Sequence, residues 1–393
     1  MRESLLHRLS PWTFATVAVL FVALWQWATV TANYAGNWTA LFCTGALQRH
    51  PALVQTEHIY LFQNSTGFDG QFYHYIAHDP LLRSDLKNYI DDPRMRYHRI
   101  LIPLLAYGLA LGQSRLIDRA YLIVCLLGIG LGVFWSCRFA QRSDLAAAWG
   151  LLFLAMPAIP ITVDRLVVDG GLAALTAAFL YYSPSATSRP LTWKLFAVLV
   201  CAALTRDTGI LLVLGYCAYL ACRREFRMAG LCLLSAAAAI VWFGYVQANT
   251  TGQSYRPALL PFASIVRALG HPSGYPADVP FAQAVVAADY LAFAGALLGF
   301  GFALLWFARA PCHPARMVAA LFALLGLLVQ ITGQWENVYA FGRIYTPLLL
   351  CLAAIAAPAR NAWLLTPVAL MLPRIAIQFA PQALGVIHWI LMW

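Results

Sequence analysis

Long apolar runs constrain this chain more than any other feature. Of its 393 residues, 61% are hydrophobic and only 11% are charged, and the mean hydropathy is +0.68. A soluble domain has about 25% charged residues, and a membrane-crossing helix needs about 20 apolar residues in succession. Because a helix satisfies its own backbone hydrogen bonds in lipid, long continuous runs favour helices over a barrel. The sequence therefore predicts an all-α, polytopic transmembrane helical bundle.

The apolar segments make the whole chain, 1–393, a single transmembrane domain with no obvious internal repeat. We predict about eleven crossings from their number and length. Segment 99–112 is short and is expected to be interfacial or re-entrant, because it and 118–137 together make one net crossing. The segments are 11–32, 99–112, 118–137, 145–163, 167–183, 192–204, 208–222, 228–248, 283–307, 315–332, 344–357 and 362–379.

Basic residues predict the orientation of the bundle. The net charge of +10 is scattered among loops, so it does not form a nucleic-acid surface and fits cytoplasmic loops and anionic lipid. Arg2 and Arg8 precede the first span, which predicts a cytoplasmic N-terminus and places the long loop 33–98 outside. Other loops expected on the cytoplasmic side carry Arg138, Arg142, Arg223, Arg224, Arg227, Arg309, Arg316 and Arg360.

The outer loop 33–98 contains the most distinctive polar stretch, GFDGQFYHYIAHDP at residues 67–80. We expect short aromatic-rich helices at 57–60 and 70–77, lying at the membrane interface. Asp69 is the predicted catalytic residue, because a carboxylate beside an enclosed, partly apolar site can have a raised pKa and remove a proton from a hydroxyl. The alternative is that Asp69 only caps the helix that follows.

Three further side chains of this stretch bear on the site. Gln71 and Tyr73 are assigned to substrate binding, Tyr73 because it lies one helical turn after Asp69 on the same face. His74 and His78 have the i,i+4 spacing of zinc ligands, but the intervening residues do not match the metalloprotease pattern. We expect interfacial histidines there and assign no metal ligands, although several outer-loop acids leave room for a divalent metal.

Two arginines close the outer loop. Arg96 and Arg99 precede an apolar segment, where clustered guanidinium groups can bind a lipid phosphate through paired hydrogen bonds. The alternative is an interfacial anchor whose charged ends reach water. We assign both residues to substrate binding.

Two more arginines interrupt apolar segments far along the chain. Arg206 breaks the stretch 204–209, and Arg343 opens a late span. A charge at membrane depth is unfavourable unless it is paired or used, so both are assigned to phosphate binding. Arg206 could instead be neutralised by Asp207 within a turn, and Arg343 could be an interface anchor.

One acidic residue is placed with these arginines. Asp169 lies at the predicted outer end of a helix and is assigned to substrate binding. The alternative is that Asp169 only caps the helix that starts there.

These motifs resemble those of the GT-C superfamily of polytopic glycosyltransferases. The arrangement of one span, a long outer loop with an acidic residue, and many further helices covers the whole chain. Residues 68–73 look like the Tyr/Phe-Asp-Gly-Gln-Phe-Tyr stretch of uncharacterised bacterial members. Residues 205–209 look like a Thr-Arg-(Glu/Asp)-x-Gly turn, and residues 337–347 are similar to the arginine-containing start of a late helix. Asp69 lies farther past the first span than in many members.

The resemblance implies a GT-C-like fold and an inverting hexosyl- or pentosyltransferase of the cell envelope. It implies transfer of a sugar from a polyprenyl-phosphate donor to a lipid or glycan acceptor, on the outer side of a bacterial inner membrane. Asp69 would deprotonate the acceptor, while Arg206 and Arg343 would bind the phosphate. We therefore expect Asp69 in a cavity open to the outer face, with both arginines converging on it.

Two other classes of function use the same residues differently. A transporter or flippase would bind a phosphate-bearing lipid or solute with the arginines and would not need Asp69 as a base. The absence of repeated halves argues against that class. A structural subunit of an envelope complex would leave Asp69 dispensable.

Overall fold

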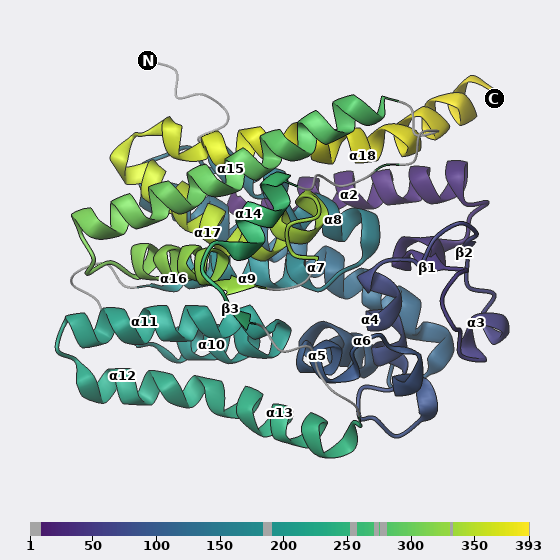
Figure 1. Cartoon of the computed structure of the whole chain (residues 1–393), viewed down its shortest axis with the longest axis horizontal. Helices are drawn as coiled ribbons and strands as arrows, with labels where there is room; N and C mark the ends of the chain where they lie inside the picture. Colours follow the sequence, from purple (N-terminus) through teal and green to yellow (C-terminus); the bar gives the residue numbers. More distant parts are fainter. Residues whose placement is uncertain are drawn as a thin grey trace.

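The computed structural model describes residues 9–183, 191–251, 258–270, 275, 281–330 and 333–392. It is 77% helical with almost no strand, which confirms the all-α class. Most long helices run along one direction of the molecule (Figure 1). Arg2 and Arg8 lie outside the described residues.

The first helix is followed by the long loop, which lies at one end of the molecule. Helix α2 begins where Ser10 accepts a hydrogen bond from the Thr13 amide, and it packs against α7 and α18. Short strands β1 and β2 pair in parallel, Thr44 opposite Leu61. The elements are α2 (Pro11–Asn33), η1 (Trp38–Phe42), β1 (Thr44–Gly45), α3 (Leu53–Thr56), β2 (Leu61–Phe62), α4 (Asp69–His78), η2 (Asp85–Tyr89), α5 (Pro93–His98) and α6 (Leu101–Leu109).

The remaining elements form the helical body. Strands β3 and β4 pair antiparallel. In chain order the elements are α7 (Ser114–Arg142), η3 (Ala147–Ala155), α8 (Ala158–Arg165), α9 (Asp169–Tyr182), α10 (Trp193–Thr205), η4 (Asp207–Gly209), α11 (Ile210–Cys222), α12 (Phe226–Leu233), η5 (Leu234–Ala236), α13 (Ala237–Asn249), β3 (Ala258–Leu259), α14 (Ala263–Gly270), α15 (Ala282–Arg309), α16 (Pro314–Leu328), β4 (Val329–Gln330), α17 (Val338–Ala359), η6 (Ala362–Leu365) and α18 (Thr366–Leu391).

The expected eleven crossings are not confirmed. Among the described residues, six helical segments are long and apolar enough to cross a membrane, or seven if the pair η3–α8, bent by 59°, is one span. The difference arises because α10, α11 and α16 are apolar but short. At 1.5 Å per residue a 13-residue helix covers about 20 Å, less than the roughly 30 Å of lipid core. The long helices nevertheless support a membrane-embedded protein.

The predicted outer-loop helices are partly right. A helix at 70–77 is confirmed as α4, but 57–60 is not helical, since α3 ends at Thr56. Helix α4 does not expose a face as an interfacial helix would, because Gly70 to Ala77 are all buried. Asp69 and Asp169 are each the first residue of their helix and do not cap it. The cap positions belong to Phe68 and Val168.

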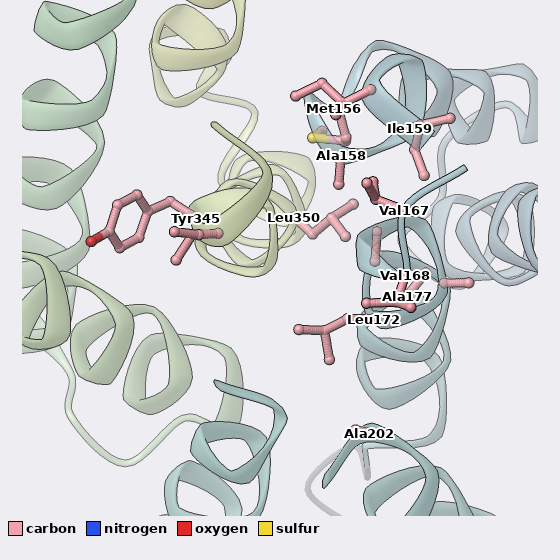
Figure 2. Close-up of a cluster of buried hydrophobic side chains, with 14 of the residues drawn as sticks. Met156, Ala158, Ile159, Val167, Val168, Leu172, Ala177, Ala202, Tyr345 and Leu350 are labelled. Atoms are coloured by element: carbon pink, nitrogen blue, oxygen red, sulfur yellow. The ribbon is translucent and has the colours of Figure 1, made fainter. Parts of the chain in front are cut away.

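A buried apolar cluster fixes α17 against α8 and α9. Figure 2 shows Leu350 of α17 pointing towards Val167 and Val168, the two residues before α9. Tyr345 points to the opposite side, where its ring meets Phe300 at 4.8 Å. This packing positions α17 against the start of α9.

The two ends of the bundle differ in charge. The α11–α12 turn with Arg223 and Arg224, and the α15–α16 turn after Arg309, lie at the left end in Figure 1. Helices α3 and α4 with β1 and β2 lie at the right end. The basic turns and the Asp69 region are therefore at opposite ends of the long helices.

Candidate functional site

Helix α4 presents Asp69 to two arginines. The Oδ2 atom of Asp69 lies 2.7 Å from Nη1 of Arg96 and 2.6 Å from Nη2 of Arg343. Gly70 lets α4 pack against the end of α8, because a Cβ at this position would lie 2.2 Å from the carbonyl oxygen of Arg165. A short loop helix, α5, and a long apolar helix, α17, thus meet at one carboxylate.

The ion pairs continue from Arg343 into the bundle. Nη1 of Arg343 lies 3.6 Å from Oδ2 of Asp169, and Asp169 also forms an ion pair with Arg206. Arg206 ends α10, and Asp169 opens α9. We call Asp69, Arg96, Asp169, Arg206 and Arg343 the aspartate–arginine network. Arg206 and Arg343, distant in the sequence, thus meet at Asp169, next to Asp69, as the sequence predicts.

Arg99 and Tyr73 lie beside this network. The Nη1 group of Arg99 donates a hydrogen bond of 2.8 Å to the Tyr73 hydroxyl, and its Nε lies 3.4 Å from a carboxylate oxygen of Asp207. Asp207 therefore turns towards Arg99 rather than neutralising Arg206 within the turn. Burial raises the pKa of Tyr73, but Arg99 and Arg96 lower it by more, so the net shift is downward.

The Arg206 turn depends on a glycine. A Cβ at Gly209 would lie 1.9 Å from the carbonyl oxygen of Ala202. Only glycine lets the chain pass this close to the last turn of α10 before α11 starts. The motif glycine therefore fixes where Arg206 stands at the helix end.

Gln71 does not join the site, contrary to its assignment. Its side-chain oxygen accepts a hydrogen bond from the Gly45 amide at 3.2 Å, and its nitrogen donates to the Thr66 carbonyl at 3.0 Å. Residues two apart on a helix point in different directions, so a side chain two positions after Asp69 faces away from the network. Gln71 ties the backbone of the outer loop together.

Enclosed positive charge exceeds enclosed negative charge at the site. Arg96, Arg99 and Arg206 are buried, and the Arg343 side chain is only 10% exposed. The enclosed carboxylates are those of Asp69, 14% exposed, and Asp169, fully buried. The other two acids are at the rim: Asp91, which pairs with Arg96 at 2.7 Å, is 42% exposed, and Asp207 is 37% exposed.

The pKa of Asp69 is shifted downward, whereas the sequence predicts an upward shift. Burial raises it, but Arg343 and Arg96 together lower it by more, so the pKa lies well below its usual range. The sequence suggests the apolar surroundings of Asp69 but not that two guanidinium groups touch its carboxylate. In this arrangement Asp69 is an ionised and weakly basic group.

Aromatic rings cover the arginines. Phe68 lies under Arg343 at 4.9 Å and under Arg165 at 4.8 Å, and Phe72 lies under Arg96 at 5.0 Å. Arg165 was not among the predicted residues. Its signal was its place beside Asp164 in an outer turn, where the two now pair at 3.1 Å.

Two cavities lie away from Asp69. One, of about 310 Å³, is apolar and lies beside Arg360 at the basic end. The other, of about 250 Å³, is lined by residues of α2, η3, α8 and α18. Neither of these is the open cavity expected at Asp69. The side chains of Arg96 and Arg343 lie against the Asp69 carboxylate instead.

A second group of titratable side chains lies at the far end of α4. Glu57, His74, His78 and Asp118 bring four ligand atoms within 4.8 Å of one another. His74 is completely buried and His78 nearly so, so the interpretation as interfacial histidines is wrong. Burial and the neighbouring His74 lower the pKa of His78 to about 3, which leaves its imidazole neutral at pH 7. The two imidazoles and two carboxylates of this group are suited to binding a metal ion.

Comparison with family models, with curated proteins and with solved structures finds no match to this chain.

Proposed function

We propose that this protein is an inverting glycosyltransferase that takes a sugar from a polyprenyl-phosphate donor at the aspartate–arginine network. The observation that carries the proposal is that Asp69, the predicted base, shares Arg343 with a buried Asp169–Arg206 pair. A base and a cluster of phosphate-binding groups within one connected network are what such a transfer needs. The apolar helices around it would accommodate the prenyl chain.

The arginines have capacity for a phosphate. Among the described residues, Nε of Arg206 and Nε of Arg343 are buried without a hydrogen-bond partner. Unsatisfied buried N–H groups are rare in folded proteins and call for an explanation. Guanidinium groups bind phosphate oxygens through paired, charge-assisted hydrogen bonds. A donor phosphate would satisfy both groups and balance the excess of enclosed positive charge.

The same arginines would control the base. While Arg343 and Arg96 hold its carboxylate, Asp69 is weakly basic. When Arg343 turns to a donor phosphate, the strongest charge lowering the pKa of Asp69 is neutralised, and the pKa rises. Donor binding would thus switch on the base that the acceptor needs.

The reaction balances with these groups. The acceptor oxygen bonds to the anomeric carbon from the face opposite the phosphate, and its proton passes to Asp69. The bond between the anomeric carbon and the phosphate oxygen breaks, and the phosphate leaves with the electron pair. Arg343 and Arg206 stabilise the charge that grows on that oxygen, which is the main electrostatic contribution expected in such a step.

The test is sugar transfer by purified protein in detergent from radiolabelled polyprenyl-phosphate sugars, with donor binding measured beside it. Asp69→Asn should lower transfer by about 10²–10⁴-fold, the usual contribution of a general base, with donor binding nearly unchanged. The matched control is Asp85→Asn, in the same loop but exposed, which should keep wild-type transfer. Full transfer by Asp69→Asn would exclude Asp69 as the base.

One observation favours the competing class, a transporter of phosphate-bearing lipid. The low pKa of Asp69 suits a permanent counter-ion for the arginines, which a binding protein needs and a base does not. Vesicles containing the protein separate the two. Movement of a fluorescent polyprenyl phosphate across the bilayer, without transfer from any donor tested, would establish the transporter.

A further inference from the structure

The second cluster draws its ligands from three separate elements. Glu57 directly follows α3, His74 and His78 occupy the last two turns of α4, and Asp118 is on the second turn of α7. Two histidines four apart on a helix present their rings on one face. All four side chains belong to the end of the molecule that carries the outer loop, and none belongs to the aspartate–arginine network.

Two of the separations between ligand atoms are close to those of a tetrahedral site. Zinc bonds of about 2.0–2.1 Å arranged tetrahedrally put ligand atoms about 3.3 Å apart. The Nε2 atoms of His74 and His78 lie 3.2 Å apart, and Nε2 of His78 lies 3.4 Å from Oε2 of Glu57. Asp118 Oδ1 lies 2.6 Å from Nε2 of His74 and 4.0 Å from that of His78. A shift of Asp118 by less than 1 Å would even out these distances.

Hydrogen bonds behind the cluster fix a lone pair on His78. Ser114 donates its hydroxyl proton to Oε1 of Glu57 at 2.6 Å. The Ser114 oxygen must then accept the 2.9 Å hydrogen bond from Nδ1 of His78, so that nitrogen carries the proton. Nε2 of His78 is therefore left as a bare lone pair facing the cluster, and Oε2 of Glu57 has no hydrogen-bond partner among the described residues. Partners that fix tautomer and orientation in this way are typical of metal ligands.

We propose that Glu57, His74, His78 and Asp118 bind one structural zinc ion. Two neutral imidazoles and two carboxylates give a net charge of −2 that Zn²⁺ cancels, and two nitrogen ligands disfavour Ca²⁺ and Mg²⁺, which prefer oxygen. The ring of His74 is held by stacking on Phe42 at 4.0 Å. Four protein ligands leave no open position, so the ion clamps the end of α3 and α4 to α7.

This clamp would act on the candidate site through α4, which carries Asp69 at its other end. It does not depend on what the protein transfers, and its test uses no transfer assay. The purified full-length chain in detergent is stripped with a chelator and titrated with Zn²⁺ against a chromogenic competitor, and bound metal is counted by mass spectrometry. We expect one zinc ion per chain.

Variants assign the ion to the cluster. His78→Gln and Asp118→Asn should lose stoichiometric binding, and Ser114→Ala should weaken it by about 10–100-fold, the usual effect of removing a supporting hydrogen bond. His388→Gln is the control, because His388 is exposed on α18 and should keep full binding. Undiminished binding in both His78→Gln and Asp118→Asn would overturn the proposal.

The wild-type protein alone keeps the proposal testable if a variant fails to fold. Co²⁺ in place of Zn²⁺ should give the intense visible bands of tetrahedral cobalt, and bleaching of those bands by one equivalent of Zn²⁺ would support the site. Failure of the wild-type chain to bind a stoichiometric amount of either ion would also overturn it.

Discussion

Two buried regions of this protein both pair arginine with aspartate, but they differ in the ratio of arginines to carboxylates. The aspartate–arginine network has more enclosed arginines than enclosed carboxylates around it. Between α15 and α18, by contrast, one arginine meets one carboxylate: Nε of Arg374 lies 2.9 Å from Oδ1 of Asp289. Tyr275 completes this triangle with hydrogen bonds to both.

The difference separates support from binding. A balanced pair within apolar helices removes the penalty of isolated charge in the membrane and can hold two helices together. An excess of arginine has no such internal solution. An anionic ligand would balance that excess, which is why we place ligand binding at the network and not at the α15–α18 pair.

The largest expected effect sharpens this contrast. Arg374→Ala leaves Asp289 as a buried charge without its arginine, and breaking a buried pair in this way destabilises by about 3–5 kcal/mol. Arg343→Ala should be milder, because Asp69 keeps Arg96 and Asp169 keeps Arg206. Detergent-induced unfolding measures both variants, and binding of the polyprenyl-phosphate donor is measured in parallel.

For donor binding, the two variants should rank in the opposite order from their losses of stability. Arg343→Ala should lose it, and Arg374→Ala should keep it wherever the protein remains folded. The double variant Asp289→Leu with Arg374→Met removes both charges and should recover most of the lost stability. Equal loss of donor binding in Arg343→Ala and in that double variant would remove the distinction between the two regions.

The second effect concerns the backbone that places Arg206. Gly209→Ala forces a methyl group against the Ala202 carbonyl, and overpacking of this kind destabilises by about 1–3 kcal/mol. It should also move Arg206 and weaken donor binding. The control is Gly230→Ala in α12, where a Cβ would meet nothing within 4 Å and helix propensity should add about 0.5–1 kcal/mol of stability. Both are measured by the same unfolding assay; wild-type donor binding and stability in Gly209→Ala would contradict the role of this turn.

Sequence was a good guide to helices and a poor guide to crossings. Apolar runs located nearly every long helix because helix formation needs only local hydrogen bonds. Whether an apolar helix crosses the membrane depends on its length and on what surrounds it. Helices α10 and α11 have 13 residues each; the sequence divides them correctly at Arg206, but each was counted as a crossing although it is short.

At the site, sequence identified the charged residues but not their partners. Asp69, Arg206 and Arg343 stand out because charge is rare in this chain. Their pairing is long-range and depends on how α17 packs on α9, so the pKa of Asp69 was predicted in the wrong direction. Gln71 was included only because it is near Asp69 in sequence, and Glu57 and Asp118 were missed because their partners lie on other elements.

The smallest expected effect tests whether donor binding releases the base. The pKa of Asp69 is lowered in the free protein by Arg343 and Arg96. Neutralising Arg343 with a phosphate removes part of that lowering, so the pKa must rise in the donor complex, by at least about one unit for a lost neighbouring charge. The fall of kcat at low pH reports the pKa of Asp69 in the donor complex. The fall of kcat/KM at low pH reports its pKa in the free protein. We therefore expect kcat to fall with decreasing pH before kcat/KM does, in transfer assays at saturating and limiting donor that extend below pH 4. Coincident acid limbs would mean that Asp69 does not change partners, and that the network is as fixed as the α15–α18 pair.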